Sequence, residues 1–107
     1  MFEGEYLNGK KNGKGKEYYD DGQLKFEGEY LNGNRHGKGK EYYYNGNLKF
    51  EGEYLYDFKI KGKFYVNEKM KYEGEYLYDK KNGKGKEYNY KGELEFEGEY
   101  LNGKKRI

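Results

Sequence analysis

The sequence lacks Ser, Thr, Cys, Pro, Ala and Trp altogether. Without Ser, Thr and Cys, the usual hydroxyl and thiol nucleophiles of covalent catalysis are missing. Without Cys there is neither a disulfide nor a thiolate metal site, which fits a reducing compartment. His36 is the only histidine, so no histidine pair can hold a transition metal. We therefore expect a non-enzymatic protein with no catalytic residues, no metal and no cofactor.

Long apolar runs are missing too. None approaches the ~18 residues that a membrane-spanning helix needs. The opening segment, MFEGEYLNGK, has no basic region followed by an apolar core, so it predicts no signal peptide. We expect a cytoplasmic protein, with a peripheral position at a membrane or at the cytoskeleton as the alternative.

The residues that are abundant point to a folded sheet. Charged residues make up 39% of the chain and hydrophobic residues only 33%, a balance typical of disorder. However, the chain also contains 16 Tyr and 18 Gly, and disordered chains are poor in aromatic residues. Tyrosine together with regularly placed glycine favours strands joined by tight turns.

One segment, residues 26–39, organises the chain and reads FEGEYLNGNRHGKG. Close relatives of its first five residues recur at Phe2, Phe50, Tyr72 and Phe96, and self-similarity at such a period indicates a repeat array. The whole chain is then one array of four full units and a half unit: 2–25, 26–49, 50–71, 72–95 and 96–107.

Each full unit predicts a strand, a turn, a second strand and a second turn. Apolar residues or glycine alternate with mostly charged residues along residues 24–31, which is the pattern of a half-buried strand. Asn-Gly pairs then indicate hairpin turns. In the second unit we place the first turn at residues 31–37 and the second strand at roughly Lys38 to Tyr43. We expect an all-β fold with one elongated antiparallel sheet of about nine strands, roughly 40 Å long.

The third unit is two residues shorter than the others. We place one loss before Gly62 and the other between Val66 and Met70, both in turns, so the array should continue without a break. This unit also has Ile60 in place of a glycine.

Gly28, in the first strand of the second unit, should leave a slot for an aromatic ring of a neighbouring strand.

An aromatic trough should line one face of the sheet. Its residues either form a ligand or peptide groove or, as we expect for a one-layer protein, the core itself. They are Phe2, Tyr6, Phe26, Tyr30, Phe50, Tyr54, Tyr72, Tyr76, Phe96 and Tyr100.

A basic edge should run along one side of the sheet, because all first turns of a meander lie on that side. Segments at these turns contain most of the 22 Lys and Arg residues. They offer an attractive surface to an anionic lipid or an acidic protein tail. Alternatively, they are merely solvent-exposed turn residues that keep the protein soluble. The candidate residues are Lys10, Lys11, Arg35, His36, Lys59, Lys80, Lys81 and Lys104.

Five Glu-x-Glu pairs place two carboxylates on one strand face each time. Five copies favour a structural role over catalysis or calcium binding. We expect these glutamates to pair across strands with Lys14, Lys16 and their equivalents.

The motifs FEGEYLNG, HGKGKEYY and NG, repeated in this order, resemble the MORN (membrane occupation and recognition nexus) repeat. The resemblance covers nearly the whole chain, although the family's tryptophan position in the first strand is Tyr here. It implies one β-hairpin per repeat, elongated arrays, scaffolding roles and, in some members, phosphoinositide binding. The second strand and turn also resemble a variant of the repeat in bacterial antitoxin-like proteins.

We therefore expect a scaffold that binds a protein partner. The alternatives are peripheral binding to phosphoinositide or other anionic phospholipid through the basic edge, and neutralising binding like that of an antitoxin. We expect no nucleic-acid partner. Edge strands near Phe2 and Phe96 expose unpaired backbone groups, which makes a homodimer an open alternative.

Overall fold

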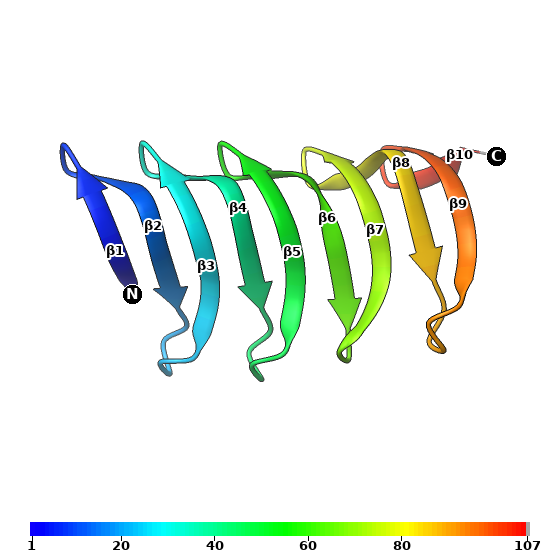
Figure 1. The fold of residues 1–107 in the computed structure, drawn as a ribbon, viewed down its shortest axis with the longest axis horizontal. Coiled ribbons are helices and arrows are strands. Elements are labelled where there is room, and N and C mark those ends of the chain that lie inside the picture. The colour runs from blue at the N-terminus through cyan, green and yellow to red at the C-terminus, as the bar shows by residue number, and fades with distance from the viewer. Residues whose placement is uncertain (107) are drawn as a thin grey trace.

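The computed structural model describes residues 1–106 and contains one antiparallel sheet, whose strands lie side by side in chain order (Figure 1). The strands are β1 (Phe2–Leu7), β2 (Lys10–Tyr18), β3 (Leu24–Leu31), β4 (Asn34–Tyr42), β5 (Leu48–Leu55), β6 (Phe58–Val66), β7 (Lys69–Leu77), β8 (Lys80–Tyr88), β9 (Leu94–Leu101) and β10 (Lys104–Arg106).

The predicted single elongated sheet is confirmed. The molecule measures 47 × 26 × 16 Å, and each strand is hydrogen-bonded as a ladder only to its neighbours along the chain. The described residues form ten strands rather than about nine, because the half unit folds into a hairpin, β9–β10. Its last residue, Ile107, lies outside the described residues. No helix that could span a membrane occurs in the described part of the chain.

The hairpin turns are shorter than the sequence predicts. Asn32 and Gly33 alone connect β3 to β4, with φ values of 50° and 88° that suit a type I′ turn. The second strand therefore begins at Asn34 and not near Lys38. Gly37, with φ of 102°, lies in a bulge within β4, where the Glu29 carboxylate accepts a hydrogen bond from the Lys38 N–H at 2.6 Å.

The third unit absorbs its two deletions differently from the prediction. The first deletion falls in the bulge of β6, where Ile60 stands alone, and not in a turn. Gly52 still pairs with Gly62, so the register continues into β7. The second deletion does lie in a turn, where Asn67 and Glu68 replace the longer loop that residues 19–23 form in the first unit.

The core is a chain of aromatic rings on one face of the sheet. Phe26, Phe50 and Tyr72 are completely buried. Neighbouring rings meet edge to face; the rings of Phe26 and Tyr54, for example, are 5.3 Å apart at 89°. Burying such a side chain stabilises the fold by about 1.5–3 kcal/mol, and the edge-to-face geometry adds about 0.5–1.5 kcal/mol.

Glycine makes room for these rings. The Phe26 ring lies over Gly28 of its own strand and over Gly39 of the neighbouring strand. A Cβ atom at Gly39 would stand only 2.5 Å from Cζ of Phe26. The predicted slot at Gly28 therefore exists, but the ring in it is Phe26 of the same strand and not a ring of a neighbouring strand.

Candidate functional site

Five cations lie over the aromatic rings of the core. The Arg35 guanidinium carbon is 4.0 Å from the centre of the Phe26 ring. Lysines occupy the equivalent place in the other units, at 4.4–4.9 Å, and such contacts are worth about 0.5–2 kcal/mol each. The pairs are Lys11 with Phe2, Lys59 with Phe50, Lys81 with Tyr72 and Lys105 with Phe96.

Half-buried glutamates join these cations into a network. Arg35 bridges two strands, with Nε 3.0 Å from Glu17 and Nη1 2.8 Å from Glu41. Lys81 and Lys105 both pair with Glu87, at 3.0 and 3.2 Å. Arg35, Lys59, Lys81 and Lys105 are thus each held between a ring and one or more carboxylates.

The network changes the ionisation of its glutamates. Burial opposes the charge of Glu87, but the neighbouring side chains of Lys81, Tyr100 and Lys105 outweigh burial and lower the pKa of Glu87 to about 2. Burial likewise disfavours the charged form of Glu17, yet Arg35 and Tyr30 lower its pKa overall. Both carboxylates therefore stay ionised at neutral pH.

The structure divides the predicted basic edge into two groups. Lys11, Arg35, Lys59 and Lys81 lie half-buried over the core rings, as just described. The exposed residues at the turns are Lys10, Lys80 and Lys104.

His36 belongs to neither group. Its ring stacks on Tyr56 with 4.7 Å between centroids, and its Nδ1 accepts a hydrogen bond from the Tyr56 N–H at 3.3 Å. This contact links β4 to the first turn of the third unit.

The predicted aromatic trough is filled by its own side chains. Six of its residues are buried, and Phe2 and Tyr76 pack against the buried cluster. Phe96 is half-buried, whereas Tyr6, on the first strand, keeps 59% of its surface exposed. The buried members are Phe26, Tyr30, Phe50, Tyr54, Tyr72 and Tyr100.

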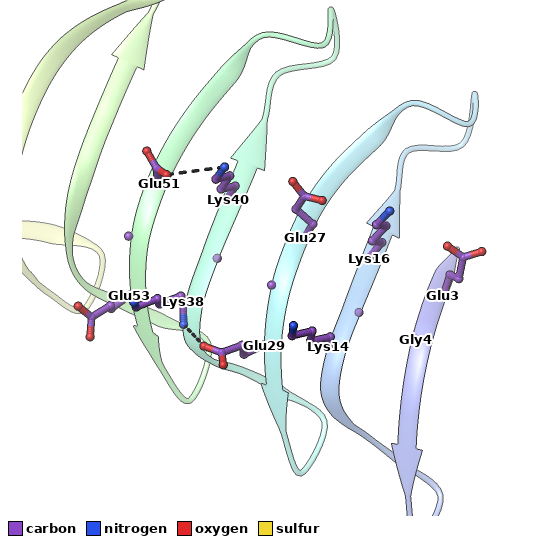
Figure 2. Close-up of a pocket in the computed structure, with 14 residues that line it drawn as sticks. Glu3, Gly4, Lys14, Lys16, Glu27, Glu29, Lys38, Lys40, Glu51 and Glu53 are labelled. Atoms are coloured by element: carbon purple, nitrogen blue, oxygen red, sulfur yellow. Dashed lines mark hydrogen bonds and ion pairs between the residues drawn. The ribbon is translucent and has the colours of Figure 1, made fainter.

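A long groove lies on the opposite face, which we call the glycine groove. Its floor is a row of glycines that runs across the strands, and its walls are two rows of side chains in which Glu and Lys alternate from strand to strand (Figure 2). Two cavities of about 770 and 940 Å³ share Glu51, Gly52 and Glu53, so the groove is continuous. The floor residues are Gly4, Gly15, Gly28, Gly39, Gly52, Gly62, Gly74, Gly85 and Gly98.

The walls show the expected cross-strand register of Glu and Lys, but among the described residues ion pairs form at only some of these positions and not at Lys14 or Lys16. Glu27 stands opposite both Lys16 and Lys40, and Glu29 stands opposite Lys14. Ion pairs join Lys40 to Glu51 at 3.8 Å, Lys61 to Glu53 at 3.3 Å and Lys86 to Glu97 at 4.0 Å.

Some groove lysines are left without a carboxylate. Glu5, Glu29 and Glu75 turn their Oε1 atoms to backbone N–H groups of the bulges, at 2.6–2.7 Å. Among residues 1–106, the amino groups of Lys14, Lys38 and Lys84 then have no ion-pair partner, and these side chains are exposed. The wall nearer the first turns thus presents free positive charge.

Sequence reasoning missed this groove although its signal was present. Lys-Gly-Lys alternates with Glu-Gly-Glu along the whole chain. The charges were interpreted as pairs and the glycines as slots for rings. A glycine that holds a ring on one face, however, leaves bare backbone on the other.

The MORN repeat family matches residues 2–24, 26–48 and 72–93, more than half of the chain. The unit between the last two matches is the one with the shortened bulge and turn. Among curated proteins, none matches this chain significantly. MORN repeats are commonly protein- or membrane-interaction repeats, and the all-β array is a scaffold type of fold. From these matches and this hairpin array, the chain belongs to the MORN-repeat family.

Proposed function

We propose that the protein is a non-enzymatic scaffold that docks a segment of a partner protein in the glycine groove. The observation that carries this proposal is the continuous groove itself, open along the sheet and walled by charged side chains. The aromatic face is closed by its own rings and cations, whereas the groove is not.

The groove is preformed. Its floor is backbone and contains no side chain that would have to move, since a Cβ atom at these glycines would point towards the rings on the other face. Its walls are held by the cross-strand register of the sheet. A rigid site loses little conformational entropy when a partner binds, which favours affinity.

The charge pattern favours a protein over a nucleic acid. Opposite signs alternate along the groove at the strand spacing of ~4.8 Å. This distance is shorter than the Debye length of about 8 Å at physiological salt, so a uniform polyanion meets attraction and repulsion in equal measure. A polypeptide carries donors, acceptors and charges of both signs that fit such a surface.

The test is selection of binders from a displayed library of random peptides. A groove variant, Lys14→Gln with Lys38→Gln and Lys84→Gln, is compared with an edge variant, Lys10→Gln with Lys80→Gln and Lys104→Gln. Each variant loses three exposed lysines. We expect selected peptides to lose binding to the groove variant and to keep it for the edge variant; peptides that bind both variants equally would contradict the proposal.

A second candidate function is binding to an anionic phospholipid membrane through the turns. The observation that favours it is a group of exposed apolar side chains at the first turns of the third and fourth units, namely Leu55, Tyr56, Phe58, Leu77 and Tyr78. The exposed Lys80 follows directly, and each basic residue at a membrane surface adds about 1 kcal/mol.

Vesicles separate the two candidates. Sedimentation with phosphoinositide vesicles, against phosphatidylserine vesicles of matched charge, should be lost in the edge variant if the turns bind lipid. Retention by the edge variant, or no sedimentation of the wild type at physiological salt, would remove this candidate. Neutralisation of a toxin-like protein would be a special case of docking in the glycine groove. For the scaffold function and for the membrane-binding function alike, we propose a cytoplasmic location.

A further inference from the structure

The lysines in the groove wall nearer the first turns form a regular series, in which only Lys61 has an ion-pair partner among residues 1–106. Lys14, Lys38, Lys61 and Lys84 come from β2, β4, β6 and β8, at matching positions of the register. They stand two strands apart, which is ~9.6 Å. The glutamates between them in this wall are Glu29 and Glu75, which cap bulges, and Glu53, which pairs with Lys61. An occupant therefore meets a lysine of this wall about every 9.6 Å, with a glutamate between each two.

This period distinguishes the conformations that a bound segment can adopt. In a β-strand, side chains of one face repeat every ~6.7 Å. In an α-helix, one face repeats every seven residues or ~10.5 Å. In a polyproline II helix, every third residue lies on the same side, at ~9.3 Å. Three such intervals separate Lys14 from Lys84. Over these three intervals, the repeating side chains of a polyproline II segment would fall out of register with the lysines by ~1 Å, and those of an α-helix by almost 3 Å.

The width of the groove favours the same conformation. Its two walls are two residues apart on each strand, which is ~6.7 Å between Cα atoms. An α-helix with side chains is ~10–12 Å across, too wide to reach the glycine floor. A polyproline II segment makes no internal hydrogen bonds, so its backbone carbonyl and N–H groups remain available to Lys and Glu side chains of the walls.

We propose that the glycine groove binds an extended segment in the polyproline II conformation with an acidic residue at every third position. The acidic side chains lie against Lys14, Lys38, Lys61 and Lys84, and the backbone follows the glycine floor. This inference rests on the proposed function and specifies the chemistry of the partner. A twelve-residue segment of this kind is ~37 Å long, which fits within the 47 Å length of the molecule.

The direct test compares three labelled peptides by fluorescence anisotropy at physiological salt. One is (Glu-Pro-Pro)₄, the second has the same composition with its four Glu residues in one block, and the third is (Lys-Pro-Pro)₄. Exposed ion pairs contribute little each, so four matched pairs should make (Glu-Pro-Pro)₄ bind about tenfold more tightly than the block peptide. The lysine peptide should bind more weakly than either.

Two variants locate the contact. The groove variant should reduce binding of (Glu-Pro-Pro)₄ to the level of the block peptide, while the edge variant, with three lysines changed outside the groove, should keep wild-type binding. Unchanged thermal unfolding of both variants shows that they are folded. Equal binding of the two glutamate peptides, or equal binding to the two variants, would overturn the inference.

The outcomes also separate this inference from the proposed function. If none of the designed peptides binds, but the library yields groove-dependent peptides with another pattern, the groove docks proteins and the polyproline II proposal is wrong. If the library yields no groove-dependent peptide either, both proposals fail.

Discussion

The guanidinium group of Arg35 lies over Phe26, with its central carbon 4.0 Å from the ring centre. Phe26 is completely buried although the protein has only one layer of sheet. The cation, held by Glu17 and Glu41, takes the place of the second layer that covers the core in larger β proteins. Side-chain stems can shield apolar surface in this way while their charged ends remain paired.

Replacement of Arg35 by Ala should destabilise the protein by about 2 kcal/mol, because it uncovers Phe26 and leaves two half-buried carboxylates without their partner. Replacement by Lys, which the other units use at this position, should cost only about half of that. Chemical denaturation of the two variants measures the difference. Equal stability of wild type and Arg35→Ala would show that the cation does not cover the core.

Gly28 should not tolerate a side chain. A Cβ atom there would lie 2.6 Å from the Lys38 carbonyl oxygen and 2.7 Å from Cα of Gly39, both in the backbone. We expect Gly28→Ala to lose about 3 kcal/mol or more. Gly46 has φ of 94° and open space around it, so Gly46→Asn should lose no more than about 1 kcal/mol. Similar losses at the two sites, measured by urea unfolding, would refute the close approach of the strands.

Glu68 offers a stabilising substitution. It occupies a two-residue turn with φ of 67°, where a residue with a side chain is strained. We expect Glu68→Gly to raise the free energy of unfolding by about 1 kcal/mol. Asp57 has φ of 73°, but its carboxylate accepts a hydrogen bond from the Arg35 N–H at 2.7 Å, so Asp57→Gly should give no gain. A gain at both positions would mean that the hydrogen bond contributes nothing.

Acid should weaken the array through Glu87. Its pKa is about 2 in the folded protein and about 4.5 when unfolded, so the carboxylate stabilises the fold above pH 4.5 and loses this effect as the pH falls towards 2. Glu87→Gln should lower the melting temperature at pH 6 and flatten its dependence on pH between 5 and 3. Glu95→Gln, at an exposed position, serves as the control. Parallel pH curves for wild type and Glu87→Gln would contradict this assignment.

Much of the fold follows from local pattern. Alternation along residues 24–31 and the Asn-Gly turns predict strands and hairpins correctly, because one face of each strand must be buried. The bulge at Gly37 was not predicted, since a glycine in a strand and a glycine in a turn look alike in sequence. The position of Lys59 is a second feature that the sequence pattern does not predict, because only the folded sheet shows that its side chain lies against Phe50 and Glu41.

The central claim is that partners dock in the glycine groove, and lysine acetylation in the presence of a selected peptide tests it most directly. Mass spectrometry reads the modification of Lys14, Lys38 and Lys84 in the groove and of Lys10, Lys80 and Lys104 at the turns, all exposed in the free protein. The account predicts that the peptide protects the three groove lysines and leaves the three turn lysines reactive. Protection of the turn lysines alone would contradict it and place binding at the edge of the sheet.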